Sequence, residues 1–336
     1  MSLKVLLNFK LNWVFLCASF WLFALPIQAK YVVAVVGKTK NDSFYQQAFK
    51  GCEQFAKQHL DFECIYDGPK DFQDIRTQVL VITDLVRRNN ISGLLIATTD
   101  SNYLVERALK KLKDNNIPVI TFDSDLLEDD QQYRLAYVGT NNFDYGVALG
   151  NELKKFTDKE VNQVCIQSGH STTPNLNKRI EGVRYALSGQ KDKRLTGENG
   201  WSEFDRCPLY SLGKREVSLG QLDKLLNIEN PPLFLAVAGF AQFNPNYAKV
   251  IAKQKQRIAS KEVVIVSADT EQMQLEVLKQ GLSSANIGQN PFEMGRLSAE
   301  LMYQYLTKGE RPAKSHYYLD FHYCQQSNAG TCTVNH

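Results

Sequence analysis

Two aspartates separated by one serine, Asp123 and Asp125, directly follow the apolar run IPVITF. A carboxylate at the mouth of a buried strand needs a partner, because burying an unpaired charge is strongly unfavourable. Two explanations are open at this point. The pair closes a loop through local hydrogen bonds, as Asp125 would in an Asx turn with Ser124, or it waits for a ligand that supplies hydrogen-bond donors.

Other strand-like runs of the sequence also end in polar or aromatic side chains. The carboxyl ends of parallel strands share one edge of a sheet, and ligands of such sheets bind beyond that edge. We therefore select as candidate binding residues Asp42, Phe44, Tyr45, Asp123, Asp125, Arg179, Phe204, Gly239, Phe240, Asp269 and Gln289.

This set of side chains suits a neutral, hydroxyl-rich ring. Carboxylates and amides accept hydrogen bonds from hydroxyl groups, and a charge-assisted bond contributes about 1.5–3 kcal/mol. Aromatic faces pack against the apolar face of such a ring. Arg179 can hold two oxygens while it neutralises a nearby carboxylate such as Asp123.

Each of these residues also has a purely structural explanation. Asp42 and Asp269 stand just before helix-like segments, so either could be only a helix cap. The aromatic residues could pack in the core or at its rim. Arg179 is harder to explain in this way, because it stands at a predicted helix start, where the helix dipole disfavours a cation.

Composition and charge narrow the class of protein. The chain has 336 residues, 43% hydrophobic and 22% charged, which suffices for two cores. The net charge of +3 comes without a long basic run, so we expect no nucleic-acid partner. The histidines lack metal-ligand spacing and no C-x-x-C occurs, so we predict no metal and no cofactor.

The first 29 residues have the order of a secretory signal. Lys4 and Lys10 precede an apolar stretch from Trp13 to Leu25, and a small residue, Ala29, follows. This order predicts export and cleavage after Ala29. An uncleaved membrane anchor is the alternative, although the stretch is shorter than the ~20 residues that a membrane span needs.

Export would place six cysteines in an oxidising compartment, where disulfides form. Fifteen pairings are possible for six cysteines. Pairing each cysteine with the next one along the chain suggests three disulfides. The alternative is that all six are buried free thiols. The suggested pairs are Cys52 with Cys64, Cys165 with Cys207, and Cys324 with Cys332.

From Tyr31 onward, β-branched runs alternate with helix-length amphipathic segments, and the alternation restarts after LAYVGTNN. Repeated strand–helix–strand units with right-handed crossovers form a parallel sheet covered on both faces. The predicted fold class is therefore α/β, with two doubly wound parallel-sheet lobes. No flexible linker separates the lobes, so strands should cross between them and a ligand should bind in the cleft.

At these residues the chain resembles the periplasmic sugar-binding proteins of the ribose, galactose and autoinducer-2 type, which are type I substrate-binding proteins of ABC transporters. The resemblance rests on IPVITFDSD followed by YVGTNNFDYGVALGNEL, on NKRIEGV, and on VVIVSADTEQMQLEVLKQGLSSANIGQNPFEMG. The resemblance assigns ligand contacts to Asp42, Phe44, Tyr45, Asp123, Arg179, Phe204, Asp269 and Gln289.

The resemblance also implies a hinge of three segments, near residues 138–140, 289–291 and 308–312. It divides the chain into a signal peptide (1–29), an N-terminal lobe (30–138 plus 291–310) and a C-terminal lobe (139–290 plus 311–336). Ser124 replaces the arginine that ribose binders of this family carry after the matched carboxylate. Ribose itself is therefore not the expected ligand.

The expected function is capture of a monosaccharide or small polyol by a periplasmic monomer and its delivery to a membrane permease of an ABC transporter. An alternative is a ligand-sensing subunit for a histidine kinase or chemoreceptor. A third reading is a secreted glycosidase that uses Asp123 and Asp269 as acid and base. We expect binding without catalysis.

Overall fold

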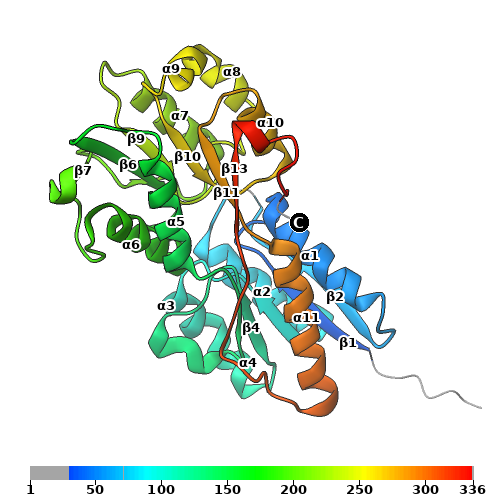
Figure 1. The fold of residues 1–336 in the computed structure, drawn as a ribbon. Helices are drawn as coiled ribbons and strands as arrows, with labels where there is room; N and C mark the ends of the chain where they lie inside the picture. Colours follow the sequence, from blue (N-terminus) through cyan, green and yellow to red (C-terminus); the bar gives the residue numbers. More distant parts are fainter. Residues whose placement is uncertain (1–29, 71, 335–336) are drawn as a thin grey trace, which may run out of the picture.

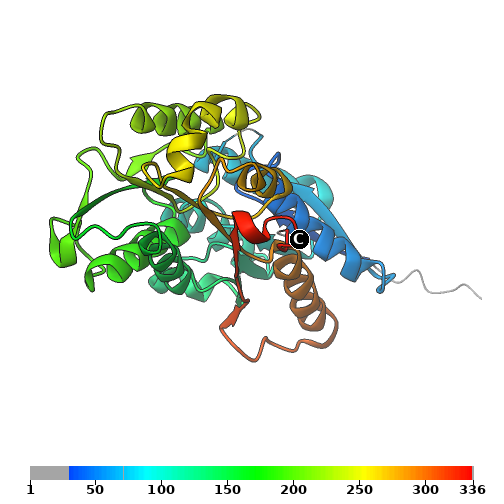
Figure 2. The same ribbon diagram turned by 45° about the horizontal axis from the view of Figure 1, so that its top comes forward.

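The computed structural model describes residues 30–70 and 72–334, and the predicted signal peptide lies outside them. The described chain forms two α/β lobes, each built on its own mainly parallel sheet (Figure 1). Figure 2 shows the same two lobes from another side, with the C-terminal segment running from one to the other. The predicted fold class is confirmed.

The sheet of the first lobe has six strands, and all of its neighbouring pairs are parallel. Its inner strands are buried on both faces, as expected for a parallel sheet covered by helices, and its two edge strands are only partly buried. In spatial order they are β12 (His316–Tyr318), β5 (Tyr137–Gly139), β4 (Val119–Phe122), β3 (Gly93–Ile96), β1 (Tyr31–Val36) and β2 (Phe62–Asp67).

The sheet of the second lobe repeats this order and differs at its edges. The pairs along it are parallel except for the last strand, which runs antiparallel to its neighbour. In spatial order the strands are β13 (His322–Gln325), β11 (Ala285–Gly288), β10 (Ile265–Ala268), β9 (Leu233–Ala236), β6 (Asn162–Ser168) and β7 (Trp201–Glu203), and β8 (Leu209–Tyr210) also pairs with β6.

The helices of the first lobe cover both faces of its sheet because strand residues alternate in direction. Val33 and Val35 of β1 pack in one apolar cluster with residues of α1 and α11. Ala34 and Val36 pack in a second cluster with α2 and the helix after β3. The helices are α1 (Ser43–Ala56), α2 (Ile75–Asn89), the continuous α3 (Ser101–Leu104), η1 (Val105–Leu109) and α4 (Lys110–Asp114), the 3-10 turn η2 (Glu128–Tyr133), and α11 (Pro291–Lys308).

The second lobe is layered in the same way. Val164 and Ile166 of β6 face α5 and α6, whereas Cys165 faces the cluster that contains α7 and α8. The helices are α5 (Asn142–Lys154), α6 (Pro174–Ser188), η3 (Glu198–Gly200), α7 (Arg215–Leu226), α8 (Tyr247–Ile251), η4 (Ala252–Gln254), α9 (Lys255–Ala259), α10 (Gln272–Lys279) and η5 (Gln326–Asn328).

The chain crosses between the lobes three times, and the third crossing differs from the expected one. The first two crossings follow β5 and β11, near the expected residues. The third lies between β12 and β13, at residues 319–321, because β12 pairs with β5 in the first sheet. The expected boundary at residue 311 is therefore too early, and the C-terminal segment contributes a strand to each lobe.

The segment before β7 forms a turn and not an extended strand. Asn199 adopts a left-handed conformation there with φ of 52°, and both Gly197 and Gly200 have positive φ. These angles form a turn, so strand β7 begins only at Trp201.

The three neighbouring cysteine pairs predicted from the sequence are disulfide-bonded in the structure. Their Cα–Cα distances are 6.1 Å for Cys52–Cys64, 5.3 Å for Cys165–Cys207 and 5.9 Å for Cys324–Cys332. The first joins α1 to β2, the second anchors the loop after β7 to β6, and the third closes the C-terminal segment after β13.

None of the helices formed by residues 30–70 and 72–334 combines the length and the apolar composition that a membrane crossing requires.

Glycines let the helices α1 and α11 touch through their backbones. A Cβ at Gly51 of α1 would overlap the carbonyl oxygen of Phe292, and one at Gly295 of α11 would overlap that of Ala48. Backbone atoms cannot move aside as flexible side chains do. This close contact fixes α11, which follows the second crossing, against the first lobe.

We expect Gly51→Ala and Gly295→Ala each to lower the free energy of unfolding by about 2–3 kcal/mol, because overpacking displaces backbone. Urea unfolding measures this change. The control is Gly220→Ala in α7, where a Cβ would meet open space. That substitution should leave stability unchanged or raise it by about 0.5–1 kcal/mol. Equal effects of the three substitutions would contradict the proposed contact.

Candidate functional site

A small cavity of about 30 Å³ lies between the lobes, at the carboxyl ends of their strands. This volume holds only a few water molecules, so a larger ligand requires the lobes to move apart. Both lobes contribute polar, charged and aromatic side chains to it. The lining residues are Lys38, Asp42, Phe44, Tyr45, Gln73 and Asp123 from the first lobe, and Asn175, Leu176, Arg179, Ala238, Phe240, Phe243, Asp269 and Gln289 from the second lobe and its boundary.

The carboxylate of Asp123 joins the two lobes. From the first lobe, the Tyr45 hydroxyl donates to Oδ2 at 3.1 Å and Lys38 Nζ lies 3.0 Å from the same oxygen. From the second lobe, Asn175 Nδ2 donates to Oδ1 at 3.1 Å and Arg179 Nη2 lies 3.5 Å from it. Two cationic side chains and two neutral donors therefore surround the buried carboxylate of Asp123.

Lys38 is a buried lysine, with 1% of its side chain exposed. Burial lowers the pKa of Lys38 from its usual value, and the Asp123 carboxylate opposes that shift. Its Nζ also donates to Asn175 Oδ1 at 2.9 Å, across the boundary between the lobes. Two of the three N–H groups of the ammonium are thus engaged by protein acceptors.

Arg179 is held on several sides by the second lobe. Nε donates to Asn142 Oδ1 at 2.7 Å, Nη1 to the Val237 carbonyl at 2.9 Å and Nη2 to Gln289 Oε1 at 3.0 Å. Its guanidinium lies 4.7 Å from the centre of the Tyr145 ring. Helix α6 begins at Pro174, so Arg179 lies in its second turn and not at the start predicted from the sequence.

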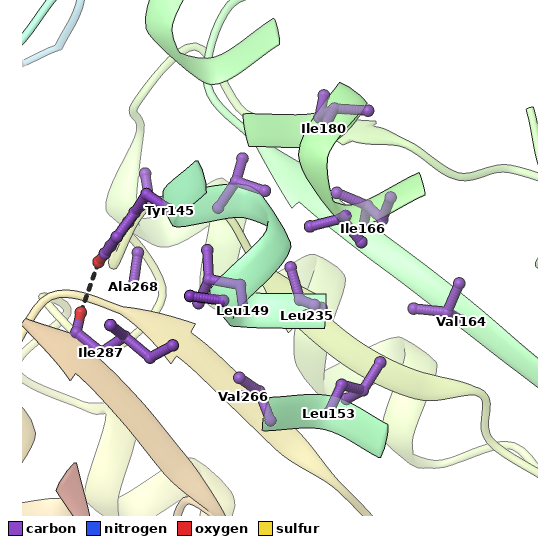
Figure 3. Close-up of a cluster of buried hydrophobic side chains, with 14 of the residues drawn as sticks. Tyr145, Leu149, Leu153, Val164, Ile166, Ile180, Leu235, Val266, Ala268 and Ile287 are labelled. Atoms are coloured by element: carbon purple, nitrogen blue, oxygen red, sulfur yellow. Dashed lines mark hydrogen bonds between the residues drawn. The ribbon is translucent and has the colours of Figure 1, made fainter. Parts of the chain in front are cut away.

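Tyr145 supports the site from the core of the second lobe. Its hydroxyl donates to the carbonyl of Ile287 (Figure 3). The same hydroxyl accepts from the backbone N–H of Asp269. Its ring lies beneath Arg179. One buried tyrosine therefore fixes the positions of two cavity residues.

Asp123 and Asp269 occupy matching places in the two lobes and share a rare backbone conformation. Each directly follows a strand, β4 or β10, that is fourth in its sheet when the strands are counted from β2 or β7. Their φ angles are 57° and 72°, in the left-handed region that aspartate tolerates better than most residues. Such strained residues concentrate at functional sites, where they aim a side chain.

The carboxyl groups of Asp42 and Asp269 keep unused acceptor capacity. The backbone N–H of Phe44 donates to Asp42 Oδ1, so Asp42 also caps α1, while no described residue donates to its Oδ2. Burial raises the pKa of Asp42 to about 6. Burial also raises the pKa of Asp269, whose oxygens accept from Gln289 and Gly239.

Aromatic side chains line the cavity from both lobes. Phe44 and Tyr45 come from the start of α1 and make an edge-to-face pair at 5.4 Å. Phe240 and Phe243 follow β9 in the second lobe. All four are buried, so their rings present apolar area to whatever occupies the cavity.

The structure brings most of the predicted candidate residues together and leaves three outside the cavity lining. Gly239 is next to it and donates to Asp269. Asp125 instead pairs with Arg134 at 2.6 Å and lines a separate groove, and Phe204 packs beside an apolar cluster of the second lobe. The eight that line the cavity are Asp42, Phe44, Tyr45, Asp123, Arg179, Phe240, Asp269 and Gln289.

Sequence reasoning missed several lining residues, of which Lys38, Gln73 and Asn175 are the most polar. Lys38 stands two residues after β1, so it lies at the edge of the sheet where ligands of parallel sheets bind. Gln73 lies in the loop between β2 and α2. Asn175 stands two residues before Asn177, which lies in the separate groove.

Two parallel-sheet lobes with a polar cavity between them define a two-lobed α/β protein whose lobes share one candidate binding site. Residues 33–311 match the family described as the periplasmic binding protein domain, and the chain belongs to this family. No protein with a curated description matches the chain.

Solved structures share the fold at low sequence identity. A solute-binding protein from Agrobacterium vitis with α-D-tagatopyranose is 21% identical, with a TM-score of 0.75 over 90% of this chain and 97% of that one. One from Burkholderia graminis with D-arabinose is 20% identical, with a TM-score of 0.76 over 92% and 100%. A chain of the XylFII–LytSN complex is 21% identical, with a TM-score of 0.70 over 89% and 98%.

The buried pair of Lys38 and Asp123 should be strongly coupled. We expect Lys38→Met or Asp123→Asn alone to lower the free energy of unfolding by about 3 kcal/mol, since each removes the nearest opposite charge from a buried ion. In the double variant the losses should fall short of additivity by about 1–3 kcal/mol. Urea unfolding of the four proteins gives this coupling.

A matched control lies close by in the sequence. Lys40 and Asp67 are 3.0 Å apart, but their side chains are 48% and 37% exposed. Lys40→Met and Asp67→Asn should couple by less than about 1 kcal/mol. A Lys38–Asp123 coupling no larger than this would show that burial does not strengthen the pair.

Proposed function

We propose that the protein is an exported, periplasmic binding protein that captures a monosaccharide or related small polyol between its lobes and delivers it to an ABC transporter. Membership of the periplasmic binding protein family supports this location and role. The ligands of the two sugar-bound neighbours, a ketohexose and a pentose, support the ligand class.

The distribution of unused hydrogen-bonding capacity is the observation that carries the proposal. Both cations of the cavity, Lys38 and Arg179, direct most of their N–H groups to protein acceptors. The larger spare capacity belongs to acceptors, foremost Asp42 and Asp269. A ligand that fits should therefore bring mainly donors, as hydroxyl groups do, and an anionic ligand would face carboxylates while both cations are already paired with Asp123.

The same inventory supports binding without catalysis. A glycosidase would need Asp123 and Asp269 as a free acid and base. Asp123 accepts from Tyr45 and Asn175 and is paired with two cations, so none of its oxygens is left for a reacting sugar. A carboxylate held in this way serves to position groups.

A sensing role is the second candidate, and the XylFII–LytSN complex favours it because a protein of this fold is held there by another protein. The two roles differ in what a surface change would do. Tyr323, on the C-terminal segment, is 47% exposed. If Tyr323→Asp abolishes a ligand-dependent transcriptional response but leaves sugar uptake intact, sensing is the correct role.

A thermal-shift screen tests the ligand class. We expect the mature protein to show a raised unfolding midpoint with at least one of D-arabinose, D-tagatose, D-allose, D-fucose and myo-inositol. A ligand at a hundred times its Kd stabilises by about 2.7 kcal/mol. Asp42→Asn keeps the helix cap but removes the charge, and should weaken binding by about tenfold or more.

The control for Asp42→Asn is Asp100→Asn. Asp100 caps α3 in the same way, through the backbone N–H of Tyr103, and does not line the cavity. Its substitution should leave Kd unchanged. If none of the five compounds raises the midpoint of the wild-type protein, the proposed ligand class is wrong.

Binding should weaken as the pH falls from 7 to 5. The pKa of Asp42 is about 6, so the carboxylate becomes protonated in this interval and loses its charge-assisted bond to a hydroxyl. By linkage, a ligand that prefers the ionised form binds more weakly below that pKa. Calorimetric titration at both pH values measures the change, and Asp42→Asn should reduce it. A pH dependence identical in the variant would assign it to another group.

A further inference from the structure

Gln73 carries a buried polar atom that the protein does not satisfy. The residue immediately precedes Asp74, the N-cap of α2, and only 4% of it is exposed. It lines the cavity between the lobes. Its Oε1 is buried, and no donor among residues 30–70 and 72–334 reaches it. An unsatisfied buried acceptor costs about 1–3 kcal/mol, so its presence calls for an explanation.

The second lobe provides a fitted place for Gln73. The backbone N–H of Gln73 donates to the carbonyl of Leu212 at 3.2 Å. A Cβ at Gly213 would lie 2.9 Å from Gln73 Cγ, and one at Gly169 would lie 2.8 Å from Gln73 Oε1. Two glycines therefore leave the space that this side chain occupies.

The receiving loop adopts an unusual conformation to provide this place. Leu212 and Gly213 have successive φ angles of 58° and 73°. A left-handed leucine is unfavourable, and such strain persists only where the surroundings enforce it. Here it turns the Leu212 carbonyl toward Gln73. The loop is tied to β6 by Leu212 N–H, which donates to the Gly169 carbonyl at 3.0 Å.

Neighbouring contacts keep the two lobes in register on either side of Gln73. Lys214 Nζ lies 4.7 Å from the centre of the Phe72 ring. Arg215 Nη2 donates to the carbonyl of Asn41 at 3.0 Å. With these contacts already joining the lobes, an amide side chain is not needed at position 73 for cohesion alone, and an apolar one would avoid the unsatisfied oxygen.

We propose that Gln73 is a ligand-contacting residue that contributes to specificity, with Oε1 accepting a hydrogen bond from one hydroxyl group of the ligand. The inference rests on the proposed function and adds to it an acceptor from the first lobe. It also assigns the strained Leu212–Gly213 turn a positioning role, because this turn fixes the backbone from which the amide reaches the cavity.

A double-mutant cycle between Gln73 and the ligand tests the proposal. The probes are the tightest-binding sugar of the five-compound panel and its monodeoxy analogues, titrated calorimetrically into the wild-type protein and into Gln73→Ala. We expect Gln73→Ala to raise the Kd of the parent sugar about tenfold. For one analogue, which lacks the hydroxyl that Gln73 recognises, the substitution should leave Kd unchanged.

The analogues separate ligand contact from a purely structural role. If Gln73→Ala weakens the parent sugar and every analogue by the same factor, the side chain only spaces the lobes, and the inference is overturned. An unchanged Kd for all sugars overturns it as well. If the wild-type protein binds none of the five compounds, the proposed function fails and this inference fails with it.

A matched pair of glycine variants tests the positioning role. Gly213→Ala should displace Gln73 and raise the Kd of the parent sugar as Gln73→Ala does. Gly309→Ala places the same strain at a φ of 70°, at the end of α11, where a Cβ would meet nothing within 4 Å. It should leave Kd unchanged. Equal effects of the two variants on Kd would remove the assigned role of the turn.

Discussion

The arrangement of the two lobes depends on the carboxylate of Asp123. Its donors come in equal numbers from the two lobes, with Tyr45 and Lys38 on one side and Asn175 and Arg179 on the other. Buried charges are tolerated only when they are paired and hydrogen-bonded. Separation of the lobes would leave the Lys38–Asp123 pair in the first lobe and Arg179 in the second, each with fewer partners. The relative placement of the lobes and the electrostatics of the cavity are therefore set by the same group.

The sheets explain why this carboxylate can occupy that position. Asp123 and Asp269 each follow the fourth strand of their sheet in a left-handed conformation, which turns the chain at the strand end. The same left-handed aspartate at a strand end occurs in both lobes. It brings one carboxyl group to the cavity from each lobe. Their roles then diverge, because Asp123 is surrounded by cations and donors, whereas burial raises the pKa of Asp269. Asp123 therefore joins the lobes, whereas Asp269 keeps the capacity to accept further hydrogen bonds.

The sequence was sufficient for the parts of the fold that local patterns determine. Alternating strand and helix segments predict two parallel sheets. Pairing each cysteine with the next one along the chain predicts the three disulfides. The sequence-based lobe boundary in the C-terminal segment is wrong because short segments such as His316–Tyr318 and His322–Gln325 have no clear hydrophobic periodicity. Tertiary pairing decides which sheet each of them joins. Polar and aromatic side chains after strand ends predict eight of the cavity residues. Lys38 was missed because a lone lysine in a polar loop normally indicates solvent, and its partners are far away in sequence.

The cavity also bears on how closure and ligand binding are balanced. Buried ion pairs gain little net stability, because desolvation offsets much of their attraction. The closed arrangement held by Asp123 should therefore be close in free energy to an open one, and a modest contribution from a ligand can decide between them. The unsatisfied oxygen of Gln73 and the raised pKa of Asp42 both oppose closure around an unfilled cavity. Hydrogen-bond donors placed against both groups would remove both penalties at once, so filling the cavity would favour the arrangement in which the lobes meet.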